Sequence, residues 1–282
     1  MNNLRPRTIF YRHERTKSDR LSIACTQTGH LLHQRKVVNQ WCEILPSLEH
    51  VRVLWFQSKV SQELFDAACQ MRNLEGLWIH FSSVKDLTNI VKAKSLRHLY
   101  MGSSPGIQSI QPLAQMTQLQ SLHLENLKRV IDLSPLANLK RLQSLSFKGG
   151  LWTIQKVKSL EPLSALTSLK LLDVSALQTL DESLRPLGSL EDLRQLCVSM
   201  DKYPIEELAW LSAKNPRLKL KAYAELGGHG VVYTCKKCKS RDSFVLLMGK
   251  GNRRQICKVC NANKFAHHIA RFNACVEEFS RE

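Results

Sequence analysis

Long apolar runs and acidic residues are both scarce in this 282-residue chain. No stretch approaches the roughly 18 consecutive apolar residues that a membrane-spanning helix needs. The first twenty residues contain several arginines but no apolar segment of signal-peptide length. These absences predict a protein without a membrane partner and with a cytoplasmic location.

The scarcity of acids gives the chain a strong positive charge. Lysine and arginine number 41 against 24 aspartates and glutamates, for a formal net charge of +17. Such a balance favours acidic partners, which include nucleic acids, anionic membranes and acidic proteins, but it says nothing about the fold.

Motifs of catalysis are also sparse. The segment GKGNRR at 249–254 lacks the GxxxxGK[ST] spacing of a phosphate-binding loop, and no HExxH pair is present. Residues Cys197 and His123 stand too far apart in the repeat described next for a direct hydrogen bond. The sequence therefore predicts a protein that is not an enzyme.

An internal repeat dominates the middle of the chain. Segments with the pattern LxxLxL, or an apolar variant of it, recur every 22 to 27 residues and are followed by a second pattern such as LSPLANL. Repeats of this length predict a solenoid in which each copy packs on its two neighbours. The segments begin at Val51, Leu74, Leu96, Leu119, Leu142, Leu169 and Leu193, with a degenerate eighth copy at Arg217.

These segments resemble the leucine-rich-repeat family, in its short class of about 22 residues per repeat. The resemblance implies an α/β solenoid shaped as a horseshoe, with about eight repeats, and protein recognition as its usual role. Proline before the second apolar pattern suits the first position of a helical segment. The chain departs from the family where an asparagine ladder is usual, since those positions hold Lys59, Ser82, Ser104, Leu127, Gly150, Leu177 and Asp201.

Three domains are predicted. Because the end of a solenoid needs a cap with a polar outer face, residues 1–45 are interpreted as an N-terminal cap of mixed strand and helix. The alternative for this segment is a basic arm that carries Arg5, Arg7, Arg12, Arg15, Lys17 and Arg20. Residues 46–224 form the predicted solenoid, and residues 225–282 form a separate metal-binding module.

The metal-binding signature consists of two CxxC pairs. Cys235 and Cys238 form the first pair, and Cys257 and Cys260 form the second after 18 intervening residues. This spacing is typical of a tetrahedral Cys₄ zinc site. Four thiolates leave no position for a substrate water, so we predict one structural Zn²⁺ ion in a finger that resembles a zinc ribbon or treble clef. A hairpin turning at 249–251 and a helix over 266–279 are expected around it.

Alternation along the predicted strands places the third, fifth and seventh repeat positions on the concave sheet. The fifth positions of the first copies are aromatic, and charged residues follow farther along. We predict that this face binds another protein, unless the N-terminal cap folds over its first rungs. The predicted partner-binding residues are Trp55, Trp78, His80, His98, Tyr100, His123, Glu125, Lys148 and Asp173.

The functional prediction is a non-enzymatic protein-binding scaffold. By analogy with other leucine-rich-repeat proteins, it includes the role of an immunity-type inhibitor that occludes a toxin or effector. The alternative is nucleic-acid binding through the basic N-terminal arm and the finger, because phosphate contacts are made by clustered cations. The candidate nucleic-acid contacts in the finger are Lys236, Lys237, Lys250, Arg253 and Arg254.

Overall fold

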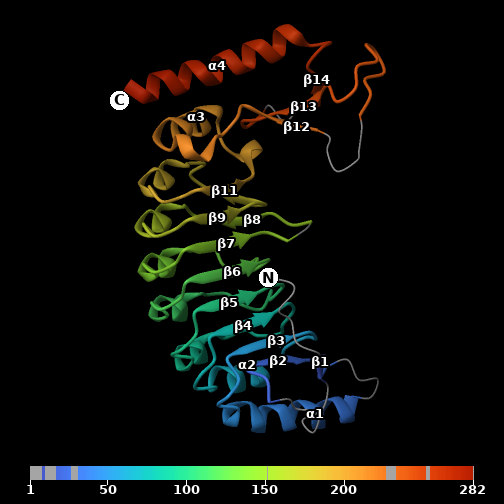
Figure 1. Cartoon of the computed structure of the whole chain (residues 1–282), viewed down its shortest axis with the longest axis vertical. Coiled ribbons are helices and arrows are strands. Elements are labelled where there is room, and N and C mark those ends of the chain that lie inside the picture. The colour runs from blue at the N-terminus through green and yellow to red at the C-terminus, as the bar shows by residue number, and fades with distance from the viewer. Residues whose placement is uncertain are drawn as a thin grey trace.

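The computed structural model describes residues 8–9, 17–26, 31–150, 152–226, 233–251 and 255–281. Its main feature is a nine-stranded sheet whose neighbouring strands are parallel, in the order β1-β2-β3-β4-β5-β6-β7-β9-β11. The strands are stacked along one side of the molecule (Figure 1). They are β1 (Thr8–Ile9), β2 (Arg20–Ile23), β3 (Val53–Phe56), β4 (Gly76–Ile79), β5 (His98–Met101), β6 (Ser121–Glu125), β7 (Ser144–Lys148), β9 (Leu171–Val174) and β11 (Gln195–Val198).

Helical segments line the opposite side of the stack. Each of the last four begins with a proline at its first or second position, as the sequence predicts. The segments are α2 (Gln62–Cys69), η4 (Thr88–Lys92), η5 (Gln111–Gln115), η6 (Ser134–Asn138), η7 (Glu161–Ala165) and η8 (Arg185–Ser189). Two short strands, β8 (Gln155–Val157) and β10 (Leu177–Thr179), form a separate parallel pair.

A column of leucines fills the space between the sheet and the helical segments. Leu99, Leu122, Leu145 and Leu172 occupy matched positions on neighbouring strands and are at most 2% exposed. Full burial of a leucine side chain stabilises a fold by about 1.5–3 kcal/mol. Since no single repeat encloses its own leucine, the stack acquires its stability from contacts between neighbours.

Serines replace part of the missing asparagine ladder. The hydroxyls of Ser82 and Ser104 lie 2.6 Å apart, Ser104 donates to the carbonyl of Gly102, and Ser82 accepts from the amide of Val84. Both serines are buried. Their hydroxyl groups therefore satisfy backbone groups that would otherwise be buried without a partner.

The N-terminal residues extend the sheet. Strand β2 pairs with β3 so that Ser22 lies opposite Trp55. Helix α1 (Leu31–Ile44) and η3 (Leu45–Ser47) follow, and Trp41 of α1 is fully buried at the end of the leucine column. Of the predicted basic arm, Arg5, Arg7, Arg12 and Arg15 lie outside the described residues, whereas Lys17 is exposed and Arg20 begins β2.

The degenerate eighth copy does not form the predicted strand. Residues Met200–Lys202 (η9), Ile205–Lys214 (α3) and Pro216–Leu218 (η10) follow β11, and Lys219 adopts the left-handed conformation with φ 49°. That conformation interrupts an extended strand. The chain then pairs elsewhere, in a three-stranded sheet of β12 (Tyr223–Glu225), β13 (Phe244–Leu247) and β14 (Gln255–Cys257).

The C-terminal module packs on the solenoid through helix α4 (Ala262–Arg281), which lies across α3 at one end of the molecule (Figure 1). Phe272 is buried in the same core cluster as the leucines, and Arg271 forms an ion pair with Glu206 of α3. The ring of His268 bonds the carbonyl of Ala222 at 2.9 Å. Among the described residues, no helix combines the length and apolar character needed to cross a bilayer.

Candidate functional site

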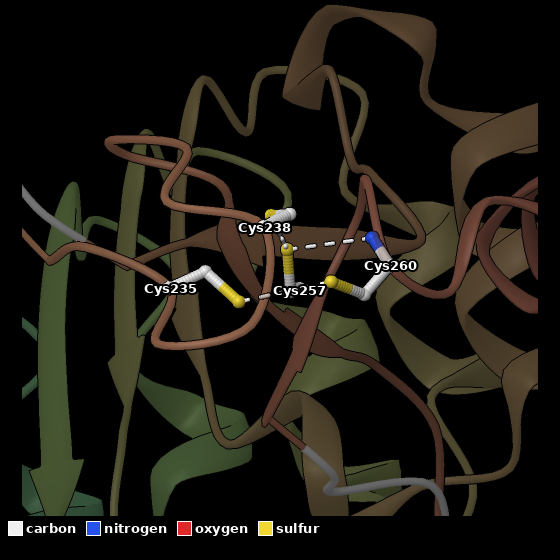
Figure 2. Close-up of side chains that lie close together, drawn as sticks. All are labelled: Cys235, Cys238, Cys257 and Cys260. Carbon is white, nitrogen blue, oxygen red and sulfur yellow. Dashed lines mark hydrogen bonds between the residues drawn. The ribbon is translucent and has the colours of Figure 1, made fainter.

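The four cysteines of the two CxxC pairs converge in the C-terminal module (Figure 2). Cys257 ends β14, Cys260 lies in the turn before α4, and the other pair lies in a turn before β13. All four Sγ atoms lie within 4.8 Å of one another, and the Sγ atoms are 3.7 Å apart for Cys235 and Cys260 and 3.6 Å apart for Cys238 and Cys257. Zn–S bonds of 2.3 Å in a tetrahedron require sulfur atoms about 3.8 Å apart. The predicted donor set is therefore brought together in a geometry that can hold a metal ion.

Hydrogen bonds lower the pKa of two of the four thiols, whereas the neighbouring Cys238 thiol and burial raise the pKa of Cys260 to about 12. The amide of Cys260 donates to Sγ of Cys257 at 3.5 Å, and this bond, together with Ser243, lowers the pKa of the Cys257 thiol to about 6. The Ser240 hydroxyl lowers the pKa of the Cys238 thiol. Thiolates are the form that ligates metals. The two nearby histidines are not in the cluster, since His267 is exposed and His268 bonds a backbone carbonyl.

Aromatic rings form a strip on the face of the sheet that points away from the leucines, which we call the sheet face. The strip consists of Trp55, Trp78, Tyr100 and His123, which occupy matched positions on β3 to β6. The two tryptophan rings stack with centroids 5.0 Å apart, and the Tyr100 and His123 rings stack at 4.4 Å. All four side chains are half-buried. The strip is thus turned away from the leucine column and partly open to solvent.

Two histidines flank this aromatic strip. His80, which follows β4, lies with its ring 5.1 Å from that of Tyr100, and His98 on β5 lies opposite Gly76. A Cβ atom at Gly76 would lie 2.3 Å from the Trp78 ring. Glycine at this position therefore lets the indole lie flat against the sheet.

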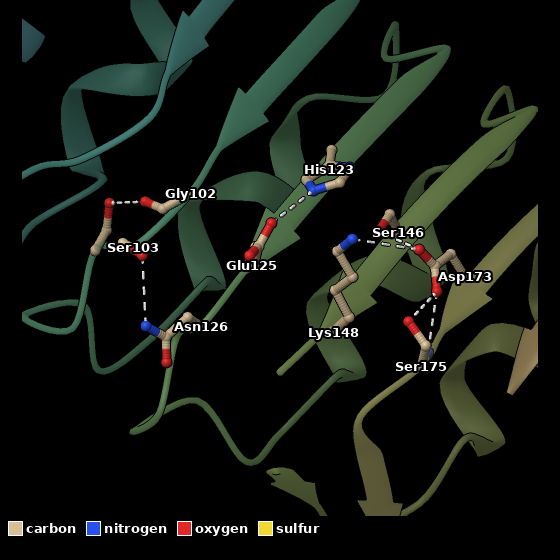
Figure 3. A network of polar contacts seen from close by, with 10 residues as sticks. Gly102, Ser103, His123, Glu125, Asn126, Ser146, Lys148, Asp173 and Ser175 are labelled. Carbon is tan, nitrogen blue, oxygen red and sulfur yellow. Dashed lines mark hydrogen bonds and ion pairs between the residues drawn. The ribbon is translucent and has the colours of Figure 1, made fainter. Parts of the chain in front are cut away.

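Charged residues continue the sheet face beyond the strip (Figure 3). Nε2 of His123 lies 3.5 Å from the Glu125 carboxylate, and Nζ of Lys148 lies 3.7 Å from that of Asp173. Burial raises the pKa of the Asp173 carboxyl, but hydrogen bonds from Ser175 and the charge of Lys148 outweigh it and lower that pKa below 3.8. The predicted partner-binding residues therefore divide into an aromatic half and a charged half on one face.

The lowered pKa of His123 in the aromatic strip leads us to expect that the stability of the protein depends on pH. Burial lowers the pKa of His123 below 6.5, and the charge of Lys148 lowers it further, while Glu125 and Asp173 oppose the shift. As the pH falls through 6.5, His123 takes up a proton more readily in the unfolded chain than in the folded one. Protonation therefore stabilises the unfolded chain, and the free energy of unfolding is highest above pH 6.5 and falls below it. We expect the free energy of unfolding to fall less between pH 7.5 and 5 in His123→Gln than in the unchanged protein. Urea denaturation across this range is the measurement, and an equal pH dependence in both proteins would refute the assignment.

Three of the five candidate nucleic-acid contacts lie within the described residues. Lys236 and Lys237 are exposed on the first cysteine turn. Lys250 forms an ion pair with Glu182 of the solenoid. The remaining two, Arg253 and Arg254, lie outside the described residues. Because Lys250 is already paired with Glu182, a phosphate group would have to compete with that carboxylate for it.

One catalytic spacing is present at Gly102–Gly106, where GSSPG matches the GxSxG pattern of hydrolase nucleophiles. The serine at its centre, Ser104, is fully buried, and its hydroxyl bonds Gly102 and Ser82. The nucleophile pattern requires an exposed serine between a strand and a helix, whereas Ser104 is followed by Pro105 in a loop. This serine belongs to the ladder that supports the turns.

Comparison with known proteins identifies the fold. No family model and no curated protein matches the chain. An internalin of Listeria monocytogenes is similar over 72% of this chain and 66% of its own, with 18% identity and a TM-score of 0.53.

Two further solved structures are similar at lower scores. Internalin C2 of the same organism shares 23% identity over 55% of this chain and 66% of its own, with a TM-score of 0.44. A leucine-rich-repeat protein of Leptospira interrogans shares 19% identity over 61% of this chain and 43% of its own, with a TM-score of 0.49. The chain thus spans about two thirds of the length of the internalins and less of the third protein. The structure and the similarity to the first internalin together show that the repeat region has the leucine-rich-repeat fold.

Proposed function

We propose that the chain is a protein-binding scaffold that holds a partner protein against the sheet face. The observation that carries this proposal is the aromatic strip, in which two stacked pairs of rings are partly exposed on a face that a solvated sheet would fill with polar residues. Tryptophan and tyrosine are the side chains that most often dominate the energy of protein interfaces.

Stacking prepares the strip for binding. Rings that already lie against one another on a rigid sheet lose little side-chain entropy when a partner covers them. The charged half beside the strip, with Glu125, Lys148 and Asp173, would orient the partner through complementary charges. A partner with an apolar surface next to paired charges of both signs fits this arrangement.

The C-terminal module serves this scaffold as a structural cap in our proposal. Its four cysteines would hold one Zn²⁺ ion, which would supply structural bonding and no open coordination position. The module then fixes α4 over the last turns of the solenoid, where Phe272 enters the core.

Affinity capture from native cells, with three strip residues replaced together, tests the proposal. The variant carries Trp78→Ala, Tyr100→Ala and His123→Ala, and the control is Trp152→Ala, whose side chain is 91% exposed and lies outside the strip. A protein retained by the unchanged chain and by the control is expected to bind the triple variant at least about 30-fold more weakly, since loss of even one anchor at an interface centre costs about 2 kcal/mol or more.

Salt titration of the same complex separates protein from nucleic acid. Phosphate contacts make log K fall linearly with log salt, with a slope set by the number of contacts, whereas an aromatic interface responds weakly. Recovery of nucleic acid alone, with unchanged affinity in the triple variant, would overturn the proposal.

A further inference from the structure

Strand β11 ends the parallel sheet with an open edge. It pairs with β9 on one side, and within the described residues no strand pairs with its other side. The amide of Gln195 donates toward β9, to the carbonyl of Lys170. Because peptide groups alternate in direction along a strand, the amides and carbonyls of Leu196 and Val198 point away from β9. In Figure 1, β11 is the last strand of the stack, and the module of β12 to β14 follows beyond it.

A groove runs along this open edge. It has a volume of about 450 Å³ and lies between β11, the η10 segment and the antiparallel pair of β12 and β13. The groove exists because Lys219 turns into the left-handed conformation where the eighth strand would have paired. Its apolar lining comes from both sides and includes Leu196, Val198, Leu218, Leu220, Leu246 and Met248.

The rim of the groove is positively charged. Lys219 and Lys221 line it and are exposed, whereas the acidic Asp201 forms an ion pair with Lys202 at 3.3 Å. Acidic side chains of an incoming segment would therefore be favoured next to the exposed Lys219 and Lys221, while its apolar side chains would enter the groove. Because successive side chains of a strand point to opposite faces, a segment in which apolar and acidic residues alternate would meet both requirements.

We propose that this edge binds an extended segment of a partner protein as an added strand, with apolar residues that alternate with acidic ones. Main-chain hydrogen bonds to Leu196 and Val198 supply affinity in this mode of recognition, and the groove supplies selectivity for side chains. The site lies at the end of the solenoid, away from the aromatic strip, and its existence does not depend on the function proposed for the sheet face.

A synthetic peptide provides the test. The probe is an eight-residue peptide in which valine alternates with aspartate or glutamate, capped at both ends and labelled for fluorescence anisotropy. Two further peptides have the same side chains, with N-methyl groups on the valine nitrogens in one and on the acidic nitrogens in the other. Only one set of nitrogens faces β11 in a given strand orientation, so we expect one methylated peptide to bind like the unmodified one and the other to lose binding at least tenfold.

Hydrogen exchange locates the bound peptide. At saturation, the amides of Leu196 and Val198 are expected to exchange at least tenfold more slowly, while the amide of Leu122 in the sheet interior does not change. The double variant Lys219→Glu and Lys221→Glu is expected to weaken peptide binding about tenfold, and Tyr100→Ala to leave it unchanged.

Four results would overturn the proposal. The first is binding of neither unmodified nor methylated peptide, and the second is equal binding of all three, which would show contact through side chains alone. The third is an exchange rate for Leu196 and Val198 in the free protein as slow as that of Leu122, which would show that the chain covers this edge itself. Loss of peptide binding in Tyr100→Ala would move the contact to the sheet face instead.

Discussion

Removal of the metal ion from the Cys₄ cluster is expected to unfold residues 233–261 and to release α4 from the solenoid. The three-stranded sheet has a small core, in which Val245, Leu247 and Ile256 are the buried residues. A core of this size supplies too little stability for independent folding, so metal binding becomes part of the folding free energy. Structural zinc contributes about 10–16 kcal/mol in comparable fingers, which makes this the largest effect that we predict.

Two variants and a chelator test this prediction. Cys257→Ser removes a ligand, and Cys197→Ser is the matched control because Cys197 is exposed on β11 and outside the cluster. We expect one zinc ion per chain in the unchanged protein and in the control, and loss of the α4 helical signal in circular dichroism after chelation or in Cys257→Ser. Absorption of a cobalt-substituted protein would report tetrahedral thiolate coordination.

Loss of α4 should also destabilise the end of the solenoid on which it packs. Phe272 would leave the core cluster, and the ion pair of Arg271 with Glu206 would be broken. Solenoid ends need caps because a terminal repeat exposes one apolar side. We therefore expect faster hydrogen exchange in α3 after chelation, with β5 and β6 unchanged. An intact α4 signal in the metal-free protein would contradict the prediction.

The repeat positions were predictable because the interactions that define each repeat are formed by residues close in sequence and recur at a regular spacing. Leucines at LxxLxL spacing and prolines before the second apolar pattern each act within one repeat, and the leucine-rich-repeat solenoid is confirmed at that level. The four cysteines were predictable for the same reason, since two CxxC pairs at this spacing can form a tetrahedral site and few other structures. The convergence of their Sγ atoms confirms the cluster.

Contacts between distant segments were not predictable. The sequence predicts strand and helix within residues 1–45, but Leu21 and Ile23 form too short a pattern to locate β2 and its pairing with β3. The packing of α4 joins Arg271 to Glu206, 65 residues earlier, and no periodicity signals such a pair. The failed strand after Pro216 depends on one backbone conformation at Lys219, which leucine spacing does not reveal.

The second large effect concerns the leucine column. Leu145→Ala is expected to destabilise the solenoid by about 3–5 kcal/mol, since Leu145 is fully buried between Leu122 and Leu172 on the two neighbouring strands. Leu180→Ala is the matched control, because the same atoms are removed from a side chain that is 69% exposed. Its effect is expected to stay within about 0.5 kcal/mol. Equilibrium urea denaturation followed by circular dichroism measures both.

The position of Leu145 makes the shape of the transition informative as well. It lies in β7, near the middle of the stack, and in a solenoid each repeat is stabilised by its neighbours. A cavity there weakens both adjoining interfaces, so the variant should unfold in two steps, with β2 to β6 separating from β9 and β11. Hydrogen exchange that is accelerated equally in all strands would show instead that the array unfolds as one cooperative unit. A destabilisation no greater than that of Leu180→Ala would contradict the leucine column as the source of stability.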